Sequence, residues 1–285
     1  MALNLTILGC GYVGTALAKS ALNKGWNVSA LTRNTQKGEE LDSIGVQQVI
    51  ISDLSSTEWH SHLNPNQDFV VNCVGASSPS PEGYVSSYID GQSSAMQWLE
   101  TGEVGTYLFT SSCSVYPQTG RKLVDETASC AGVSEKGGLL LAAEKLSFPA
   151  PNCIKRSFVL RLAGIYGPGR HLLVNKVKEG VVVDGNESRI LNLIHLDDVV
   201  SAIESCLNAS PQNLGRIYNL SDGQAATRGQ IVEWICEKLQ ISSPGFSEND
   251  TEDTPNRKIS NQRIVEELNW VPRIPSFMQG YESFL

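Results

Sequence analysis

Three glycines near the start of the chain have the type and spacing needed to hold a phosphate group. Gly9, Gly11 and Gly14 form a GxGxxG pattern, in which the first glycine permits a tight turn and the second lets the backbone approach a pyrophosphate. The third lets the following helix pack closely on the preceding strand. The N–H groups at the start of that helix, where Tyr12 and Val13 stand, then face the anion. The spacing predicts a dinucleotide-binding turn.

The residues on either side of the glycines provide the context that this pattern requires. Residues 4–8 (NLTIL) form a continuous apolar run typical of a buried strand, and residues 12–23 carry apolar positions at helical spacing. An ordinary strand-to-helix turn is the alternative interpretation. A strand, a glycine turn and a helix in this order favour nucleotide binding over it.

Short apolar runs and helical stretches continue to alternate as far as residue 162. Strands are predicted at 27–32, 46–51, 68–74, 106–111 and 157–162, and helices at 36–44, 86–100 and 135–148. Strands that alternate with helices form βαβ units, which build a parallel sheet covered on both faces. The predicted fold class is α/β, with a Rossmann-type doubly wound parallel sheet and a small C-terminal substrate lobe.

The second half of the chain is less regular. Helices are predicted at 196–207, at 227–239 with Thr227 as its cap, and at 261–268 as the last helix; a strand is predicted at 217–220 and a polar loop at 242–257. No linker separates two parts cleanly. We expect an NAD(P)-binding domain over residues 1–165 and a smaller substrate-binding lobe, packed on it, over residues 166–285.

The residues after the second strand indicate which dinucleotide is bound. An NAD site usually places an acidic residue there to bind the ribose 2′-hydroxyl, but this strand ends in Thr32 and Arg33. A guanidinium can hold a 2′-phosphate, so NADP is favoured, with NAD as the alternative. Arg33 as a solvated loop residue is the competing interpretation. Further cofactor contacts are expected just past the third and fourth strands, from Asp53, Leu54, Val74 and Gly75.

Composition excludes several classes of protein. The chain has 285 residues, 41% of them hydrophobic, and a net charge of −8, which argues against a nucleic-acid partner. Seven cysteines occur without a CxxC pair, so we expect no metal site and free thiols in a reducing compartment such as the cytoplasm. Neither a signal peptide nor a membrane span is expected. A homodimer is one of the oligomeric states left open.

Several further segments give the chain a resemblance to a known family. They are GCGYVG at 9–14, TSSCSVYP at 110–117, VDET at 124–127, LRLAGIYGPGR at 160–170, NLIHLDDVV at 192–200, IYNLSDG at 217–223 and RKISNQRIVEELNW at 257–270. Together they resemble the atypical and extended short-chain dehydrogenase/reductases, the NAD-dependent epimerase/dehydratase family, and within it the YeeZ-like branch. The resemblance covers nearly the whole chain and implies the same fold and dinucleotide binding.

The resemblance also implies an active site, from which this chain departs. The family uses a Ser after the fifth strand, to which Ser112 corresponds, and a YxxxK pair on the next helix. Counted back from Glu144, the Tyr and Lys positions hold Lys136 and Leu140, and residues 117–165 contain no Tyr that could replace it before Tyr166. The catalytic pair is therefore absent. A hydride transfer still needs a group that donates or accepts a proton.

Other residues near the implied nicotinamide are candidates for this chemistry. Lys136 and Tyr116 join Ser112 as catalytic candidates, with surface exposure as the alternative for the lysine and wall packing for the tyrosine. Cys113 is expected to be a small buried side chain. The expected substrate-binding residues are Tyr166, Arg170, His171 and His195, and the further cofactor contacts are Ser111, Leu162, Ala163 and Gly164.

Two functions follow from these patterns. The first is an oxidoreductase, or an epimerase/dehydratase-like enzyme, that acts on a small hydroxy or sugar-like substrate with a non-standard active site. The second is a redox sensor or regulator that binds NADP(H) without turnover. The missing YxxxK favours the sensor, whereas Ser112 and the glycine-rich loop before Arg170 favour the enzyme.

Overall fold

The computed structural model describes the chain except residues 1, 149–150, 214, 248–249 and 252–253. It divides into two compact units, each made of several segments. Unit 1 comprises Met1–Val115, Ser134–Arg161 and Val200–Tyr218, and unit 2 comprises Tyr116–Val133, Leu162–Val199 and Asn219–Leu285. The units thus differ from a single division at residue 165, because the chain passes between them several times.

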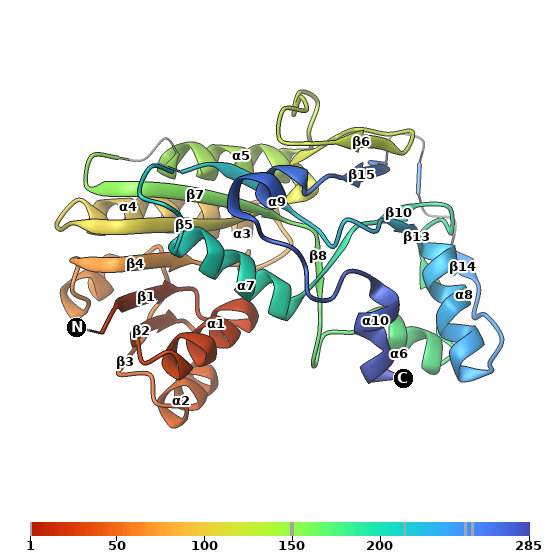
Figure 1. Cartoon of the computed structure of the whole chain (residues 1–285), viewed down its shortest axis with the longest axis horizontal. Coiled ribbons are helices and arrows are strands. Elements are labelled where there is room, and N and C mark those ends of the chain that lie inside the picture. Colours follow the sequence, from red (N-terminus) through yellow and green to blue (C-terminus); the bar gives the residue numbers. More distant parts are fainter. Residues whose placement is uncertain (1, 149–150, 214, 248–249, 252–253) are drawn as a thin grey trace. The chain divides into compact units, whose positions relative to one another are not determined.

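A seven-stranded parallel sheet in the order β12-β7-β5-β4-β1-β2-β3 dominates unit 1 (Figure 1). Its strands are β1 (Asn4–Leu8), β2 (Asn27–Thr32), β3 (Gln48–Ile51), β4 (Gln67–Asn72), β5 (Val104–Ser112), β7 (Ile154–Leu162) and β12 (Ile217–Leu220). The apolar runs read from the sequence become these strands because their side chains are buried in the sheet, except in the edge strand β3, whose residues are half-buried or exposed. From β1 the chain continues to β2 and β3 on one side of the sheet, and then to β4, β5, β7 and β12 on the other. The switch point of this doubly wound fold therefore lies between the neighbouring strands β1 and β4.

Helices cover this sheet in two groups (Figure 1). The first group contains α1 (Tyr12–Asn23), α2 (Thr35–Ser43) and α7 (Leu196–Leu207), of which α1 and α7 are joined by a hydrogen bond of 2.7 Å from Ser20 Oγ to Glu204 Oε1. The second contains α3 (Pro81–Tyr84), a π-helical segment (Val85–Asp90), α4 (Gly91–Leu99) and α5 (Glu135–Ser147). The interior between sheet and helices includes the fully buried rings of Trp59, Trp98 and Tyr107.

Unit 2 is built from short strand pairs and short helices. Its strands are β6 (Lys122–Val124), β8 (Gly164–Tyr166), β9 (Val183–Asp184), β10 (Ile190–Leu191), β11 (Leu193–His195), β13 (Ala226–Thr227), β14 (Phe246–Ser247) and β15 (Arg257–Ile259). Its helices are α6 (Leu172–Lys178), α8 (Arg228–Leu239), α9 (Gln262–Leu268) and α10 (Phe277–Tyr281). A core formed by α6, α8 and α10 buries Val177, Ile231 and Tyr281.

Most elements predicted for the sheet are confirmed, and the differences lie mainly in unit 2. The predicted loop at 242–257 contains the two-residue strand β14, which pairs in parallel with β9, and ends where β15 begins; its residues 248–249 and 252–253 lie outside the described residues. The helix predicted last, now α9, is followed by α10. Thr227 caps α8 as predicted, with Gln230 completing a reciprocal capping box. Strands of two or three residues depend on their partner, which the local sequence does not reveal.

None of the helices in the described part of the chain is long and apolar enough to span a membrane. The seven cysteines are free thiols, as expected.

Candidate functional site

The glycine turn follows β1 and opens α1. Gly9 has a φ of +74°, and a Cβ atom there would lie only 2.5 Å from the Cα of Val74 in the segment after β4. Only glycine fits this close approach. A Cβ on Gly11 would meet nothing nearer than the carbonyl oxygen of Gly9 at 4.0 Å, so this face of the turn is open. A Cβ on Gly14 would press against Ile7 at 3.0 Å, which explains the close packing of α1 on β1.

The start of α1 has the features of an anion site. No side chain caps the helix at Gly11, and no acidic residue lies in its first turn, where Tyr12 is half-buried and Val13 is buried. The positive end of the helix dipole therefore keeps its preference for a negatively charged group. This open glycine face beside an uncapped helix start fits a pyrophosphate, so the residues present suit a dinucleotide.

The other cofactor candidates of unit 1 meet the glycine turn at one edge of the sheet. Because the strands are parallel, their carboxyl ends share this edge, where ligands of doubly wound sheets bind. It carries Thr32 and Arg33 at the end of β2, Asp53 and Leu54 after β3, Val74 and Gly75 after β4, and Ser111 and Ser112 at the end of β5. Tertiary structure thus brings together residues that the sequence spreads over a hundred positions.

Arg33 lies exposed at the start of the turn into α2. Its Nη2 donates a hydrogen bond of 3.4 Å to the carbonyl oxygen of Ser77, so the guanidinium reaches the loop that follows β4. Thr32 is buried, and its Oγ1 accepts the N–H of Asn34 at 3.4 Å. Asn34 in turn caps α2 through the N–H of Lys37. The end of β2 therefore presents a cation and polar groups, with no acidic side chain at position 32, 33 or 34.

The two cofactor candidates after β3, Asp53 and Leu54, differ in exposure and in their hydrogen bonds. Asp53 is exposed, and its Oδ1 accepts hydrogen bonds from the N–H and the hydroxyl of Ser55 at 3.0 and 2.8 Å. These hydrogen bonds fix the position of the Asp53 carboxylate at the carboxyl edge of the sheet. Leu54 is buried and accepts, through its carbonyl oxygen, the indole N–H of Trp59 at 3.2 Å.

A buried ionic cluster supports the end of β5. Ser111 Oγ donates to Glu144 Oε1 at 2.6 Å, and Arg161 binds both carboxylate oxygens, with Nε at 3.0 Å and Nη2 at 2.7 Å. All three residues are at most 5% exposed. Cys113 is buried as expected and donates to the carbonyl oxygen of Arg161 at 3.0 Å. Ser112, between Ser111 and Cys113 in the sequence, is half-buried, and its Oγ accepts the N–H of Ser114 at 3.1 Å.

The helix after β5 carries no tyrosine. Lys136 stands in the first turn of α5, half-buried, with its Nζ 5.6 Å from the centre of the Tyr84 ring. Leu140, where the family's lysine would stand, is buried with 2% exposure. Sequence analysis did not select Tyr84, because its approach to Lys136 depends on the packing of α3 against α5.

Tyr116 is part of a buried hydrogen-bond network in unit 2. Its ring is fully buried, and its hydroxyl donates to Asn219 Oδ1 at 2.8 Å. The N–H of Asn219 donates to Glu126 Oε1 at 2.7 Å. Burial raises the pKa of Glu126, against the lowering effect of that N–H. These contacts are the wall packing that was the alternative for Tyr116; a catalytic part for it stays a prediction.

Tyr166 and His195 lie on the paired strands β8 and β11. Their rings contact edge-to-face with centres 5.2 Å apart, and both residues are at most 4% exposed. The Tyr166 hydroxyl donates to the carbonyl oxygen of Ser276 at 3.4 Å, and burial raises its pKa. Burial lowers the pKa of His195, against the nearby charges of Asp197 and Asp198, which favours a neutral imidazole at neutral pH.

The remaining candidates of unit 2 differ in exposure. Arg170 is exposed in a turn bridged to Gly167, whereas the ring of His171 stacks on Phe284 with centres 4.5 Å apart. Leu162 and Ala163 are buried, and Gly164 is exposed, with its N–H bound to the carbonyl oxygen of Asn192 at 2.9 Å. Arg170 is therefore the most accessible cation among these candidates.

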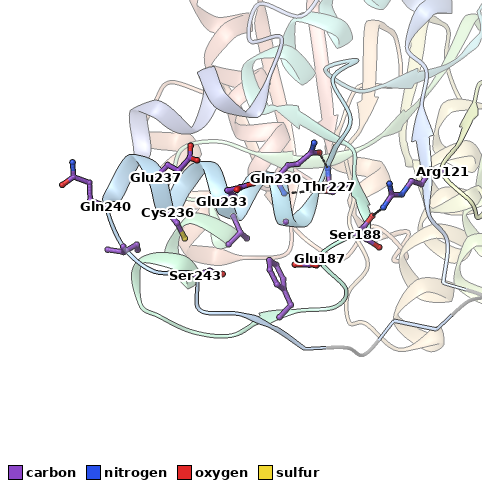
Figure 2. Close-up of a pocket in the computed structure, with 14 residues that line it drawn as sticks. Arg121, Glu187, Ser188, Thr227, Gln230, Glu233, Cys236, Glu237, Gln240 and Ser243 are labelled. Atoms are coloured by element: carbon purple, nitrogen blue, oxygen red, sulfur yellow. Dashed lines mark hydrogen bonds between the residues drawn. The ribbon is translucent and has the colours of Figure 1, made fainter.

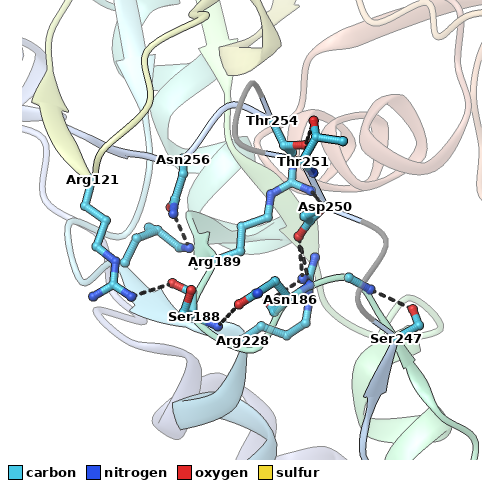
Figure 3. Close-up of polar contacts among 12 residues, drawn as sticks. Arg121, Asn186, Ser188, Arg189, Arg228, Ser247, Asp250, Thr251, Thr254 and Asn256 are labelled. Atoms are coloured by element: carbon cyan, nitrogen blue, oxygen red, sulfur yellow. Dashed lines mark hydrogen bonds and ion pairs between the residues drawn. The ribbon is translucent and has the colours of Figure 1, made fainter.

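Unit 2 also contains a polar cluster centred on Asp250, a residue that sequence analysis did not select. Asp250 accepts from Arg189 Nη1 at 2.9 Å, from Arg228 Nη1 at 3.3 Å and from the N–H of Asn186 at 2.9 Å (Figure 3). The N–H of Asn186 and the two guanidiniums hold the pKa of Asp250 below its usual range, although burial opposes this. Arg189 is thus occupied by a carboxylate. Asp250 lies in a polar segment without helical or strand periodicity, so no sequence signal marked it.

A cavity of about 790 Å³ runs along α8 in unit 2 (Figure 2). Figure 2 shows Glu233 and Glu237 on α8 at this cavity, with Arg121 at one end. The guanidinium of Arg121 donates to the carbonyl oxygen of Ser188 at 2.9 Å. No residue selected from the sequence as a site candidate lines this cavity.

The fold and the glycine turn define a dinucleotide-binding protein of the doubly wound class, and comparison with known proteins specifies its family. The sequence model of the NAD dependent epimerase/dehydratase family matches residues 5–221. The chain belongs to this NAD-dependent family, which confirms the resemblance and the fold class.

Several individual proteins are similar to this chain. Protein YeeZ of Escherichia coli K12 is 28% identical over 279 residues, which cover 95% of this chain and 96% of YeeZ. The structure of MoeE5 in complex with UDP-glucuronic acid and NAD has a TM-score of 0.84 at 21% identity, covering 98% of this chain and 96% of MoeE5. UDP-glucuronic acid 4-epimerase of Bacillus cereus, with the same two ligands, has a TM-score of 0.83 at 19% identity, covering 98% and 97%.

Proposed function

We propose that this protein binds a nicotinamide dinucleotide at the Gly9–Gly14 turn and acts as an oxidoreductase, or as an epimerase/dehydratase-like enzyme, on a small hydroxy or sugar-like substrate. One observation carries the proposal: Gly9 closes against Val74 while the face at Gly11 stays open before an uncapped helix. Such a turn lets a pyrophosphate approach the backbone. The two structural neighbours, which hold UDP-glucuronic acid and NAD, support a sugar-like substrate.

The proposed cofactor is NADP(H), with NAD(H) as the alternative. Arg33 is exposed at the end of β2, where it can reach a 2′-phosphate, and Thr32 and Asn34 add no repelling charge. The alternative has its own support, since the two structural neighbours hold NAD.

The cofactor supplies hydride transfer when it is bound, and the chain's own residues must handle the proton. We propose that the hydroxyl of Ser112, at the carboxyl end of β5, binds the substrate oxygen. Lys136 is the proposed cation beside that site, on the first turn of α5. The substrate-binding parts of Tyr166, Arg170, His171 and His195 stay predictions.

A second function has a specific observation in its favour. Leu140 is buried in the helix that would carry the acid/base pair, and α5 has no tyrosine to be activated. A chain that binds the dinucleotide without turnover, as a redox sensor, requires neither residue. Cytoplasmic localisation, a homodimer and the lack of a nucleic-acid partner are predictions common to both functions.

Calorimetric titration with NADPH and NADH tests the cofactor proposal. The wild-type protein is expected to bind NADPH more tightly, and Arg33→Asp is expected to weaken NADPH binding at least about tenfold, because it replaces a charge-assisted contact by repulsion. NADH binding should change little. Lys122→Asp, at another exposed cation, is the matched control. Unchanged NADPH binding by Arg33→Asp would rule out the 2′-phosphate assignment.

A turnover assay separates the enzyme from the sensor. UDP-glucuronic acid is a first probe in a screen of hydroxy and sugar-like compounds, followed by the absorbance of the reduced nicotinamide and by product analysis. Ser112→Ala should lower kcat at least about a hundredfold, and Ser114→Ala, at an exposed neighbour, should not. If Ser112→Ala retains full turnover, Ser112 has no part in the mechanism.

A further inference from the structure

A lysine and a tyrosine from separate helices meet beside the carboxyl edge of the sheet in unit 1. Lys136 Nζ lies 5.6 Å from the centre of the Tyr84 ring, within the range of a cation–π contact. Both side chains are half-buried. In the described part of the chain no carboxylate forms an ion pair with Lys136, so its charge is held by an aromatic ring and is not neutralised.

The position of Lys136 along the sheet follows from the buried cluster at the end of β5. Glu144 of α5 binds Ser111, the residue next to the last in β5, and this bond fixes the helix against the carboxyl end of that strand. A helix connecting parallel strands runs antiparallel to them. Lys136 stands eight residues earlier in the same helix, and at 1.5 Å per residue this places it about 12 Å beyond Glu144. It therefore lies past the edge of the sheet, on the side where ligands bind.

Tyr84 reaches the same edge from β4. The loop after β4 leads directly into α3. Within this loop, the N–H of Ser77 donates to Ser87 Oγ at 2.9 Å, which ties the loop to the π-helical segment. Tyr84 immediately precedes that segment, and its ring packs 5.3 Å from the ring of Tyr88. Single turns of π-helix are rare and occur frequently at functional sites. Here the π-helical turn supports a functional role for the corner of the sheet edge formed by Lys136 and Tyr84.

The sheet order decides which part of a dinucleotide this corner faces. A dinucleotide lies across the switch point, with its pyrophosphate at the start of α1 and its two nucleotide halves on opposite sides. The side of β2 and β3 carries Arg33 and Asp53, the residues assigned to the adenosine half. Lys136 and Tyr84 flank β4 and β5, on the nicotinamide side.

We infer that Lys136, held by the ring of Tyr84, makes the protein prefer the reduced dinucleotide over the oxidised one. The oxidised nicotinamide ring carries a positive charge and the reduced ring carries none, whereas the rest of the dinucleotide is unchanged. An unneutralised ammonium near the ring disfavours only the oxidised form. The inference rests on the proposed dinucleotide binding, and it applies equally to an enzyme and to a redox sensor.

Calorimetric binding measurements test this inference without any substrate. The quantity is the ratio of the Kd for the oxidised form to the Kd for the reduced form, measured for the NADP⁺/NADPH and the NAD⁺/NADH pairs. We expect Lys136→Met to lower this ratio about three- to tenfold, since it removes the repelling charge, and Lys136→Arg to preserve it. Lys145→Met removes an exposed lysine from the same helix and should leave the ratio unchanged.

The tyrosine is tested in the same measurement. Tyr84→Phe keeps the ring and should keep the ratio, whereas Tyr84→Leu should shift it toward the value of Lys136→Met. Circular dichroism establishes that each variant is folded. A Lys136→Met ratio equal to that of the wild type, or an equal shift with Lys145→Met, overturns the inference while dinucleotide binding stands. Failure of the wild-type protein to bind either form overturns both.

Discussion

The carboxyl group of Asp222 shows how strongly a single residue's environment can set its chemistry. Asp222 is 4% exposed, and its Oδ2 has no hydrogen-bond partner among the described residues, while Oδ1 accepts the N–H of Gln224 at 2.9 Å. Burial, with a smaller contribution from the charge of Asp198, raises the pKa of Asp222 to about 7. The folded protein therefore binds a proton that the unfolded chain releases near pH 4.

This proton makes stability depend on pH. The contribution of Asp222 is fully present below about pH 4 and is lost as the pH rises to about 7, because only the unfolded chain ionises easily over that range. Asp222→Asn cannot ionise. We expect it to gain up to about 4 kcal/mol relative to the wild type between these pH values, measured by urea unfolding.

The comparison with the wild type isolates this residue from other buried acids such as Glu126. Asp42→Asn, at an exposed position, is the control and should follow the wild type at every pH. A constant difference between Asp222→Asn and the wild type from pH 4 to pH 7 would show that Asp222 ionises normally in the folded protein.

Among the secondary-structure elements, α8 depends on local signals that its sequence fully contains. Thr227 Oγ1 accepts the N–H of Gln230 at 3.1 Å, and the Gln230 side chain accepts the N–H of Thr227 at 2.8 Å (Figure 2). Each bond satisfies a backbone group that the helix leaves without a partner.

We expect Thr227→Ala to lower the free energy of unfolding by about 1 kcal/mol, because it removes the cap. Thr227→Ser retains the hydroxyl and should cost less than half as much. Chemical denaturation of the three proteins in parallel checks the order. Equal losses for alanine and serine would mean that the side-chain methyl group, and not the cap, is what matters.

The short strands of unit 2 are elements that local sequence patterns do not predict. Strand β14 has two residues and exists because Phe246 pairs with Val183 of β9. Such strands carry no periodicity of their own, and the polar composition of residues 242–257 predicts a loop. The pairing partner, far away in the sequence, decides the structure.

For the molecule as a whole, a dinucleotide should act as a stabiliser, since it binds the folded chain and not the unfolded one. At a free concentration one hundred times its Kd, NADPH should add about 2.7 kcal/mol to stability, and the melting temperature should rise accordingly. Gly11→Val should remove this rise. A Cβ at Gly11 has room in the protein itself, with its nearest neighbour at 4.0 Å, but occupies the face assigned to the pyrophosphate.

Differential scanning fluorimetry with and without NADPH measures the effect. Ala131→Val, which adds bulk at an exposed position of unit 2, is the control. A rise in Gly11→Val equal to that in the wild type would place the dinucleotide elsewhere.

The sequence by itself determined the doubly wound sheet and its cofactor turn. Apolar runs such as residues 4–8 specify buried strands, because a strand covered on both faces needs apolar residues throughout. The tight turn at Gly9 could be predicted from the sequence, because its positive φ angle favours glycine. The loss of the YxxxK pair is equally visible, since it concerns residue types at fixed spacing within one helix.

Only the tertiary structure decided which distant residues meet. Tyr84 and Lys136 are 52 positions apart, and their contact depends on the packing of α3 against α5. The raised pKa of Asp222 and the binding of Arg189 to Asp250 likewise follow from burial and from neighbours brought together by folding. Local sequence sets backbone preference and amphipathic pattern, whereas charge and proximity at a site are properties of the packed chain.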